Sequence, residues 1–142
     1  RKTPLYLAIE KENVEIVSVL ISYEKTDVNF GYKSEELIND EEILTINETP
    51  LYAAVDQENL EIIETLLQNE KVNINLCSTY MSKEDGMDQK RAPLHSAVES
   101  QNIKIIRALL NNDKIDVNIV DEQGKKPIEY TKSKRIINLF DT

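Results

Sequence analysis

The stretch TPLYLAIEKENVEIVSVLISYEKTDVN at residues 3–29 returns twice along the chain. Residues 49–75 read TPLYAAVDQENLEIIETLLQNEKVNIN, residues 92–118 read APLHSAVESQNIKIIRALLNNDKIDVN, and the three align without a gap. Residues 126–140 carry a shorter version that begins KPIEY. A chain that repeats one helix-sized pattern folds as stacked units, each of which buries its apolar side against its neighbours. We call these four stretches units 1 to 4.

Each full unit has the periodicity of two short helices. In unit 2, Leu51, Ala54 and Val55 recur at the i, i+3, i+4 spacing, and a second apolar group begins at Ile62 after a polar break. A proline opens the first helix of every unit, where its missing N–H leaves no hydrogen bond unmade. An asparagine stands where each second helix should begin, and we expect a helix N-cap at each of these positions: Asn13, Asn59 and Asn102.

The TPLY or APLH start, the paired leucines of the second helix and the closing D-V-N resemble the ankyrin repeat, and the resemblance covers nearly the whole chain. It implies an all-α fold, namely an ankyrin-type helix-pair solenoid of three full repeats and a shortened C-terminal repeat, forming a single domain at residues 1–142. It also implies a structural role for His95. The family usually has glycine before the second helix, where this chain has Glu12, Glu58 and Gln101. If those residues adopt positive φ, each costs on the order of 1 kcal/mol.

Two connections between units carry insertions, at residues 30–48 and 76–91, whereas the third is a short turn containing Gly124. The pairs Asn39-Asp40 and Asp85-Gly86 are turn dipeptides, and the segment Ser78-Thr79-Tyr80-Met81 has strand propensity. We predict two extended β-hairpin fingers that lie side by side, because consecutive turns of such a stack are neighbours. Pairing into a joint sheet would satisfy their backbone groups. The alternative is that both insertions are flexible surface loops.

Composition favours a protein partner. The chain has 142 residues, of which 26 are acidic and 17 are basic, for a formal net charge of −9. Nucleic acids and anionic membranes require clustered cations, so we expect neither, and a partner with a basic surface fits better. No apolar run reaches transmembrane length. The single cysteine, Cys77, has no intramolecular partner, which favours a reducing compartment such as the cytoplasm, and a monomer is favoured.

The residues that usually carry chemistry are missing. His95 is the only histidine, and the adjacent Ser96 lacks the glycine context of a nucleophile elbow. The sequence has too few ligands in suitable spacing for zinc and no glycine-rich phosphate loop. We therefore predict a non-catalytic protein–protein interaction scaffold with no cofactor. The alternative is a regulatory or inhibitory ankyrin segment of a larger enzyme or effector whose catalytic domain lies outside this chain.

The resemblance implies that partners bind the exposed side of the first helices and the turn tips. The corresponding helix positions here are Leu7, Glu10, Lys11, Ala53, Asp56, Gln57, Ser96, Glu99 and Ser100. Aromatic residues and methionine are favoured at interfaces, which adds four finger candidates: Phe30, Tyr32, Tyr80 and Met81. The alternative for these four is packing of one finger against the other.

Two further expectations come from comparing the units. The equivalent residues Glu10, Asp56 and Glu99 should stack into an acidic column that attracts a basic partner, unless they form an ordinary solvated face.

The second helix of unit 1 is apolar between Ile16 and Ile21, although an end unit should have a more polar outer side. We therefore expect an upstream capping segment or self-association at that side.

Overall fold

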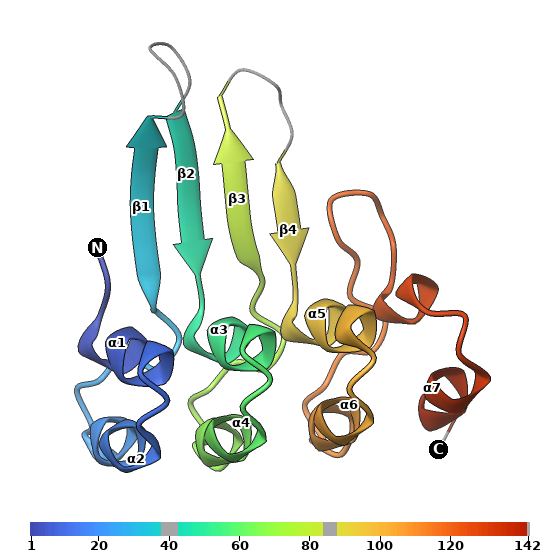
Figure 1. The fold of residues 1–142 in the computed structure, drawn as a ribbon, viewed down its shortest axis with the longest axis horizontal. Coiled ribbons are helices and arrows are strands. Elements are labelled where there is room, and N and C mark those ends of the chain that lie inside the picture. The colour runs from blue at the N-terminus through green and yellow to red at the C-terminus, as the bar shows by residue number, and fades with distance from the viewer. Residues whose placement is uncertain (38–42, 84–87, 142) are drawn as a thin grey trace.

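The helices of this computed structural model, which describes residues 1–37, 43–83 and 88–141, follow the repeat. The helix pairs lie in a row, with the first helix of each unit in one layer and the second helix in another (Figure 1). The pairs are α1 (Pro4–Glu10) with α2 (Val14–Ser22), α3 (Pro50–Asp56) with α4 (Leu60–Leu67), and α5 (Pro93–Ser100) with α6 (Ile103–Leu110). A 3-10 turn η1 (Pro127–Tyr130) and α7 (Lys134–Leu139) form the shortened fourth unit.

Local capping explains where the helices begin. The Thr3 and Thr49 hydroxyls accept hydrogen bonds from the N–H groups of Tyr6 and Tyr52, at 3.1 and 3.2 Å. The predicted asparagine caps are confirmed, because each side chain accepts from the backbone N–H three residues on, at 3.0, 3.1 and 3.3 Å in units 1, 2 and 3. These bonds satisfy N–H groups that a helix start leaves unpaired.

The turn between the two helices of each full unit has positive φ at the residue where the family usually has glycine. Glu12, Glu58 and Gln101 have φ angles of 53°, 56° and 58°. Two of these side chains also connect neighbouring units, because Asn59 donates to Glu12 at 3.3 Å and Asn102 donates to Glu58 at 3.1 Å. A glycine would relieve the strained backbone but would remove these contacts.

The core runs along the stack between the two helix layers. The leucine and alanine predicted to be buried in each full unit are at most 6% exposed: Leu5, Leu51, Leu94, Ala8, Ala54 and Ala97. His95 has the predicted structural role. Its Nδ1 accepts from the Ala92 N–H at 3.2 Å, and its Nε2 lies 2.9 Å from the Lys125 carbonyl oxygen.

The two insertions form one antiparallel sheet in the order β1-β2-β3-β4 (Figure 1). Its strands are β1 (Tyr32–Leu37), β2 (Ile43–Glu48), β3 (Ser78–Ser82) and β4 (Gln89–Arg91). The hairpins of successive connections join through β2 and β3, from the pair Leu44 and Ser82 to the pair Asn47 and Thr79. The structure thus agrees with the predicted helix-pair repeats with β-hairpin fingers, and the joint sheet adds strands to a fold otherwise built of helices. The predicted turns Asn39-Asp40 and Asp85-Gly86 lie outside the described residues.

Close backbone contacts hold the base of the sheet against the helices. At Gly31, just before β1, a Cβ atom would lie 2.6 Å from the Glu48 carbonyl oxygen and 2.8 Å from the Tyr6 ring, so a side chain would not fit. The Thr49 N–H donates to the Ser78 hydroxyl at 3.0 Å. At the other edge, the Lys90 N–H donates to a carboxylate oxygen of Glu122 at 2.9 Å. These contacts hold the helix-proximal ends of the strands in a defined position against the repeats.

Asparagines link the loops that follow the second helices. Asn29 accepts from the Asn73 N–H at 2.7 Å and donates to the Lys71 carbonyl oxygen at 2.9 Å. Asn75 makes the same two contacts one unit later, with the Asp116 N–H and the Lys114 carbonyl oxygen, both at 2.8 Å. These bonds fix the spacing of consecutive units on the side away from the first helices.

Candidate interaction surface

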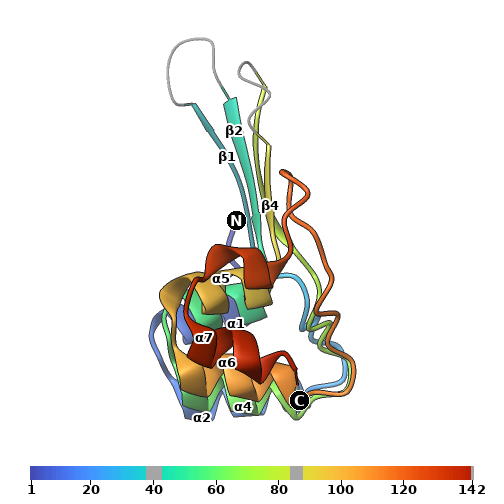
Figure 2. The same ribbon diagram turned by 90° about the vertical axis from the view of Figure 1, so that its right-hand side faces the viewer.

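One face of the four-stranded sheet turns toward the first helices. We call this sheet face, together with the adjoining exposed side of the first helices, the inner face. In Figure 2 the sheet rises from the helices, and the first helices extend to one side of its base. Strand register places Tyr32 opposite Glu48, Ile46 opposite Tyr80 and Ser78 opposite Arg91, so these side chains share one face of the sheet. That face looks toward the helices, because Tyr32 stacks on Tyr6 of α1 with ring centroids 5.5 Å apart.

Two tyrosines hold a carboxylate at the centre of the inner face. The Tyr80 hydroxyl donates to Glu48 at 3.1 Å, and the Tyr6 hydroxyl also hydrogen-bonds to Glu48. Burial raises the pKa of Glu48 above its ordinary 4.5, these hydrogen bonds oppose the rise, and the charges of Asp56 and Glu10 add to it. Burial and the Glu48 charge also raise the pKa of both tyrosines, which keeps their hydroxyls protonated as donors.

Ion pairs interrupt the predicted acidic column. Lys2 pairs with Glu10 at 2.6 Å, and Arg91 pairs with Glu99. These are the two ion pairs of the described residues, and the exposed Asp56 forms none there. The column was predicted from three acidic residues at equivalent places, but two of them are paired within the chain, because the residue before the aligned repeat is a cation in units 1 and 3.

Lys2, Glu48 and Arg91 occupy the same place in successive units, each directly before the first residue of the aligned repeat. The prediction from sequence missed these three residues. Aligning the units one residue further upstream would have shown that the charge at this place alternates in sign. The sequence does not show which groups these charges meet, because the fold brings each of them near the end of the first helix of its own unit.

The nine helix candidates differ in exposure. The exposed ones are Leu7, Lys11, Asp56, Gln57, Glu99 and Ser100, and Glu10 is half-buried. Ala53 and Ser96 are only 4% and 8% exposed, and Ser96 hydrogen-bonds to Tyr52. These two do not lie on an exposed helix side as expected, because their helices, α3 and α5, each contact neighbouring units on both sides. Leu7 is 44% exposed because, among the described residues, α1 contacts only one neighbouring first helix.

The four finger candidates do not form one cluster. Tyr32 and Tyr80 lie half-buried on the inner face. Met81 is 40% exposed on the opposite face of the sheet, as it must be when it directly follows Tyr80 in a strand. Phe30, before β1, borders a hollow of about 180 Å³ that Tyr32, Glu48 and Leu76 also line. The structure therefore brings the two tyrosines to one surface, places Phe30 beside Tyr32 and puts Met81 on the opposite face.

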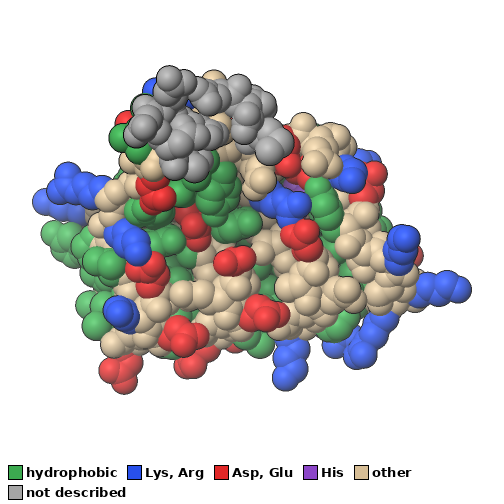
Figure 3. Space-filling model, turned by 45° about the horizontal axis from the view of Figure 1, so that its top comes forward, with side chains coloured by type: hydrophobic (Ala, Val, Ile, Leu, Met, Phe, Trp, Pro, Cys, Tyr) green, Lys and Arg blue, Asp and Glu red, His purple; other side chains and the backbone are tan. Residues whose placement is uncertain are grey.

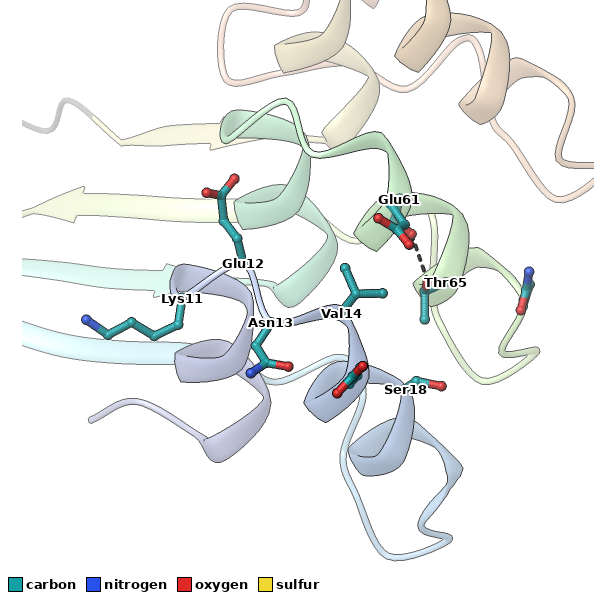
Figure 4. Close-up of a pocket in the computed structure, with 9 residues that line it drawn as sticks. Lys11, Glu12, Asn13, Val14, Ser18, Glu61 and Thr65 are labelled. Atoms are coloured by element: carbon teal, nitrogen blue, oxygen red, sulfur yellow. Dashed lines mark hydrogen bonds between the residues drawn. The ribbon is translucent and has the colours of Figure 1, made fainter.

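A larger hollow lies between units 1 and 2, away from the sheet. It measures about 830 Å³, and its lining includes Lys11, Asn13 and Ser18 from unit 1 and Glu61 and Thr65 from unit 2 (Figure 4). The Thr65 hydroxyl donates to the Glu61 carbonyl oxygen at 2.8 Å, within its own helix. Small-molecule sites are concave and mostly apolar with a few convergent polar groups, whereas this lining is mainly charged and polar. Among the described residues, no group of acidic, histidine or cysteine side chains could hold a metal ion.

The surface charge is uneven. Seen partly from above the sheet in Figure 3, acidic side chains are spread over the surface below the fingers, and lysines and arginines stand at both ends of the row of units as well as near its middle. Hydrophobic side chains gather at one edge, over unit 1 (Figure 3). The inner face thus combines tyrosines with excess negative charge.

The family model for ankyrin repeats, in three copies, matches residues 1–77 and 34–121, and the chain belongs to this family. No curated protein matches the chain. Among solved structures, it is similar to the ankyrin repeat domain of Bcl-3, described as a unique member of the IkappaB protein family, with 20% sequence identity and a TM-score of 0.70. That match covers 97% of this chain and 50% of the other, so this chain spans half the length of that domain.

Ankyrin repeats are generally protein–protein interaction modules, and their fold is typically non-catalytic. None of the helices in the described ranges is long and apolar enough to cross a bilayer.

Proposed function

We propose that this chain is a non-catalytic scaffold that binds a protein partner through the inner face. The first helices supply one side of the binding surface and the four-stranded sheet supplies the other. The exposed candidates Asp56 and Gln57 stand on the helix side, and Tyr32 and Tyr80 stand on the sheet side. A partner in the corner would touch both.

The joint sheet is the observation that carries this proposal. Separate flexible loops would lose conformational entropy when a partner ordered them, whereas strands that are already paired lose little. The pairing of β2 with β3 combines both insertions into one surface, continuous with the first helices. Tyrosines give such a surface rigid contact area together with a polar tip.

The second candidate is a regulatory or inhibitory segment of a larger enzyme or effector. The apolar side of unit 1 favours it, because Leu7, Ile16 and Val19 are 44%, 49% and 68% exposed. Exposed apolar side chains that lie together are typical of a surface that packs against another protein segment. In that arrangement the inner face would still be free for a partner.

Photocrosslinking from defined positions tests the proposal. Benzoylphenylalanine is introduced in separate variants at Gln57 on the helix side and at Gln89 on the sheet side, both of which are exposed. Lys104, exposed on α6, is the control position. In a lysate of the source cell, the first two variants should capture the same protein, identified by mass spectrometry, and the control should not. Equal capture from Lys104 would indicate that the partner does not bind specifically at the inner face but also contacts the second helices.

A further inference from the structure

Unit 2 reverses a charge that its neighbours keep. In units 1 and 3 the residue before the repeat is a cation that pairs with the carboxylate near the end of the first helix, as Lys2 does with Glu10 and Arg91 with Glu99. In unit 2 the same two places hold Glu48 and Asp56. These carboxylates lie near enough that the charge of Asp56 raises the pKa of Glu48. The central unit therefore has two acids where its neighbours have an ion pair.

Aromatic rings accompany each of the paired cations. Lys2 Nζ lies 5.7 Å from the Tyr6 ring centroid and 5.5 Å from that of Tyr32. The Arg91 guanidinium lies 4.7 Å from the Tyr130 ring centroid. Each flanking unit thus holds its cation by a carboxylate and by an aromatic ring, two kinds of group that both attract a cation.

The central unit has two carboxylates in the equivalent places, and Lys2 and Arg91, cations near enough to act on its groups, are each paired with a carboxylate of their own unit. The Tyr80 and Tyr6 hydroxyls bond to the Glu48 carboxylate. Burial is the main cause that raises the pKa of the Tyr52 hydroxyl; the charges of Asp56 and Glu48 add to the rise, and the charge of Arg91 opposes it. The half-buried Glu48 carboxylate loses part of its hydration and is repelled by the exposed Asp56 carboxylate, a cost that a cation between them would remove. In the flanking units, the group that contacts the equivalent carboxylate is the cationic side chain of a lysine or an arginine.

We propose that the protein partner of the inner face places an arginine or lysine side chain between Glu48 and Asp56. The occupant is a basic segment of a protein, and the inference rests on the function proposed above. Arginine suits the place better, because its planar guanidinium can bond to a carboxylate with two N–H groups while it stacks on a tyrosine ring.

An NMR titration tests this inference with a defined probe. The probe is the tripeptide acetyl-Gly-Arg-Gly-amide, and its control is the same peptide with citrulline, which has nearly the same shape but no charge. In the wild-type protein the arginine peptide should shift the amide signals of Glu48, Asp56 and Tyr80, with an apparent affinity at least about fivefold above that of the citrulline peptide.

Two variants separate charge from shape. Glu48→Arg supplies the missing cation within the chain and should pair with Asp56 as Arg91 pairs with Glu99, so the arginine peptide should lose its preference over the citrulline peptide. Asp56→Asn changes an exposed residue and should reduce the preference without affecting the fold, as circular dichroism would check.

Equal shifts from both peptides, or an undiminished preference in Glu48→Arg, would overturn the inference. The proposed function has its own readout. If the crosslinks from Gln57 and Gln89 persist while the arginine preference is missing, the inner face binds a protein but not through this pair of carboxylates. If those crosslinks also fail, the proposed function fails with it.

Discussion

Units 1 and 2 have nearly the same sequence pattern, yet they differ in what surrounds them. Ile62 is fully buried and its equivalent Ile16 is 49% exposed. Leu66 is likewise fully buried, whereas its equivalent Leu20 is half-buried. Helix α3 contacts both α1 and α5, whereas α1 contacts only α3 among the first helices of the described residues. One sequence pattern therefore gives a core position or a surface position according to the number of neighbouring units.

The two units also differ in charge. Lys2 pairs with Glu10 in unit 1, and the same places in unit 2 hold two carboxylates. Neighbouring copies of one repeat can thus diverge at surface positions while their buried positions stay alike. Matched substitutions at equivalent positions test both differences.

The largest difference is expected for truncation of a core leucine. Leu66→Ala should cost about 2–5 kcal/mol of the free energy of unfolding, because it leaves a cavity between fully packed units. Leu20→Ala should cost less than about 2 kcal/mol, since that side chain is already partly hydrated and the open side of the unit can adjust. Urea denaturation of both variants measures the difference. Equal losses would mean that unit 1 is packed as tightly as unit 2.

Overpacking gives a smaller contrast. Ala54 is fully buried, and Ala54→Leu should cost about 1–3 kcal/mol because the added side chain has no space. Ala8, in the same place in unit 1, is 6% exposed, and Ala8→Leu should cost less than about 1 kcal/mol. Thermal unfolding checks both. A wild-type melting temperature for Ala54→Leu would show that the assigned helix register is wrong.

The charge difference between the two units should make neutralising substitutions at Glu48 and at Lys2 change the free energy of unfolding in opposite directions at neutral pH. Burial raises the pKa of Glu48 in the folded protein, so ionisation above its ordinary 4.5 favours the unfolded state. Glu48→Gln should therefore raise stability at pH 7 and have little effect at pH 3, where both states are protonated. The pKa of Lys2 is raised by its hydrogen bond with Glu10, so Lys2→Gln should lower stability slightly at pH 7.

Urea titrations of both variants at the two pH values measure these signs. The wild-type protein and Lys2→Gln both keep Glu48, so both should lose stability from this group as the pH rises above 4.5, whereas Glu48→Gln should not. Lys2→Gln is therefore the control for Glu48→Gln. A loss of stability for Glu48→Gln at pH 7 would mean that the carboxylate is a net stabilising group of the fold.

The smallest effect is expected on the outer side of unit 1. Val19 is 68% exposed, and Val19→Lys should change the free energy of unfolding by no more than about 0.5 kcal/mol. Thr65, its equivalent in unit 2, is half-buried, and Thr65→Lys should be the more destabilising of the two. A loss of more than about 1 kcal/mol for Val19→Lys would show that this side of unit 1 is covered in solution.

Sequence reasoning predicted the features that depend on local signals. The prolines and asparagines mark the helix starts, because each signal occurs in every full unit. The place before each asparagine only raised the question of positive φ, which the structure then shows. The joint sheet could also be predicted, since consecutive connections are neighbours in space.

Contacts that depend on neighbours were harder to predict. Ala53 and Ser96 looked like exposed helix positions, and their burial follows from units packed on both sides. The separation of Tyr80 from Met81 needed only the alternation of a strand, whereas the shared face of Tyr32 and Tyr80 needed the register of three strands. The Lys2–Glu10 and Arg91–Glu99 pairs join residues eight positions apart across a complete helix, a spacing that no single-helix pattern indicates.

The ladder between β2 and β3 also affects the cooperativity of unfolding. In a linear array of repeats, stability depends on each unit and on its contacts with the next, and end units can fray alone. Here the hairpin after unit 1 is hydrogen-bonded to the hairpin after unit 2, so the first three helix pairs share a second connection besides their helix contacts. Units 1 and 3 should therefore exchange their core amides in the same cooperative event as unit 2, despite the open side of unit 1.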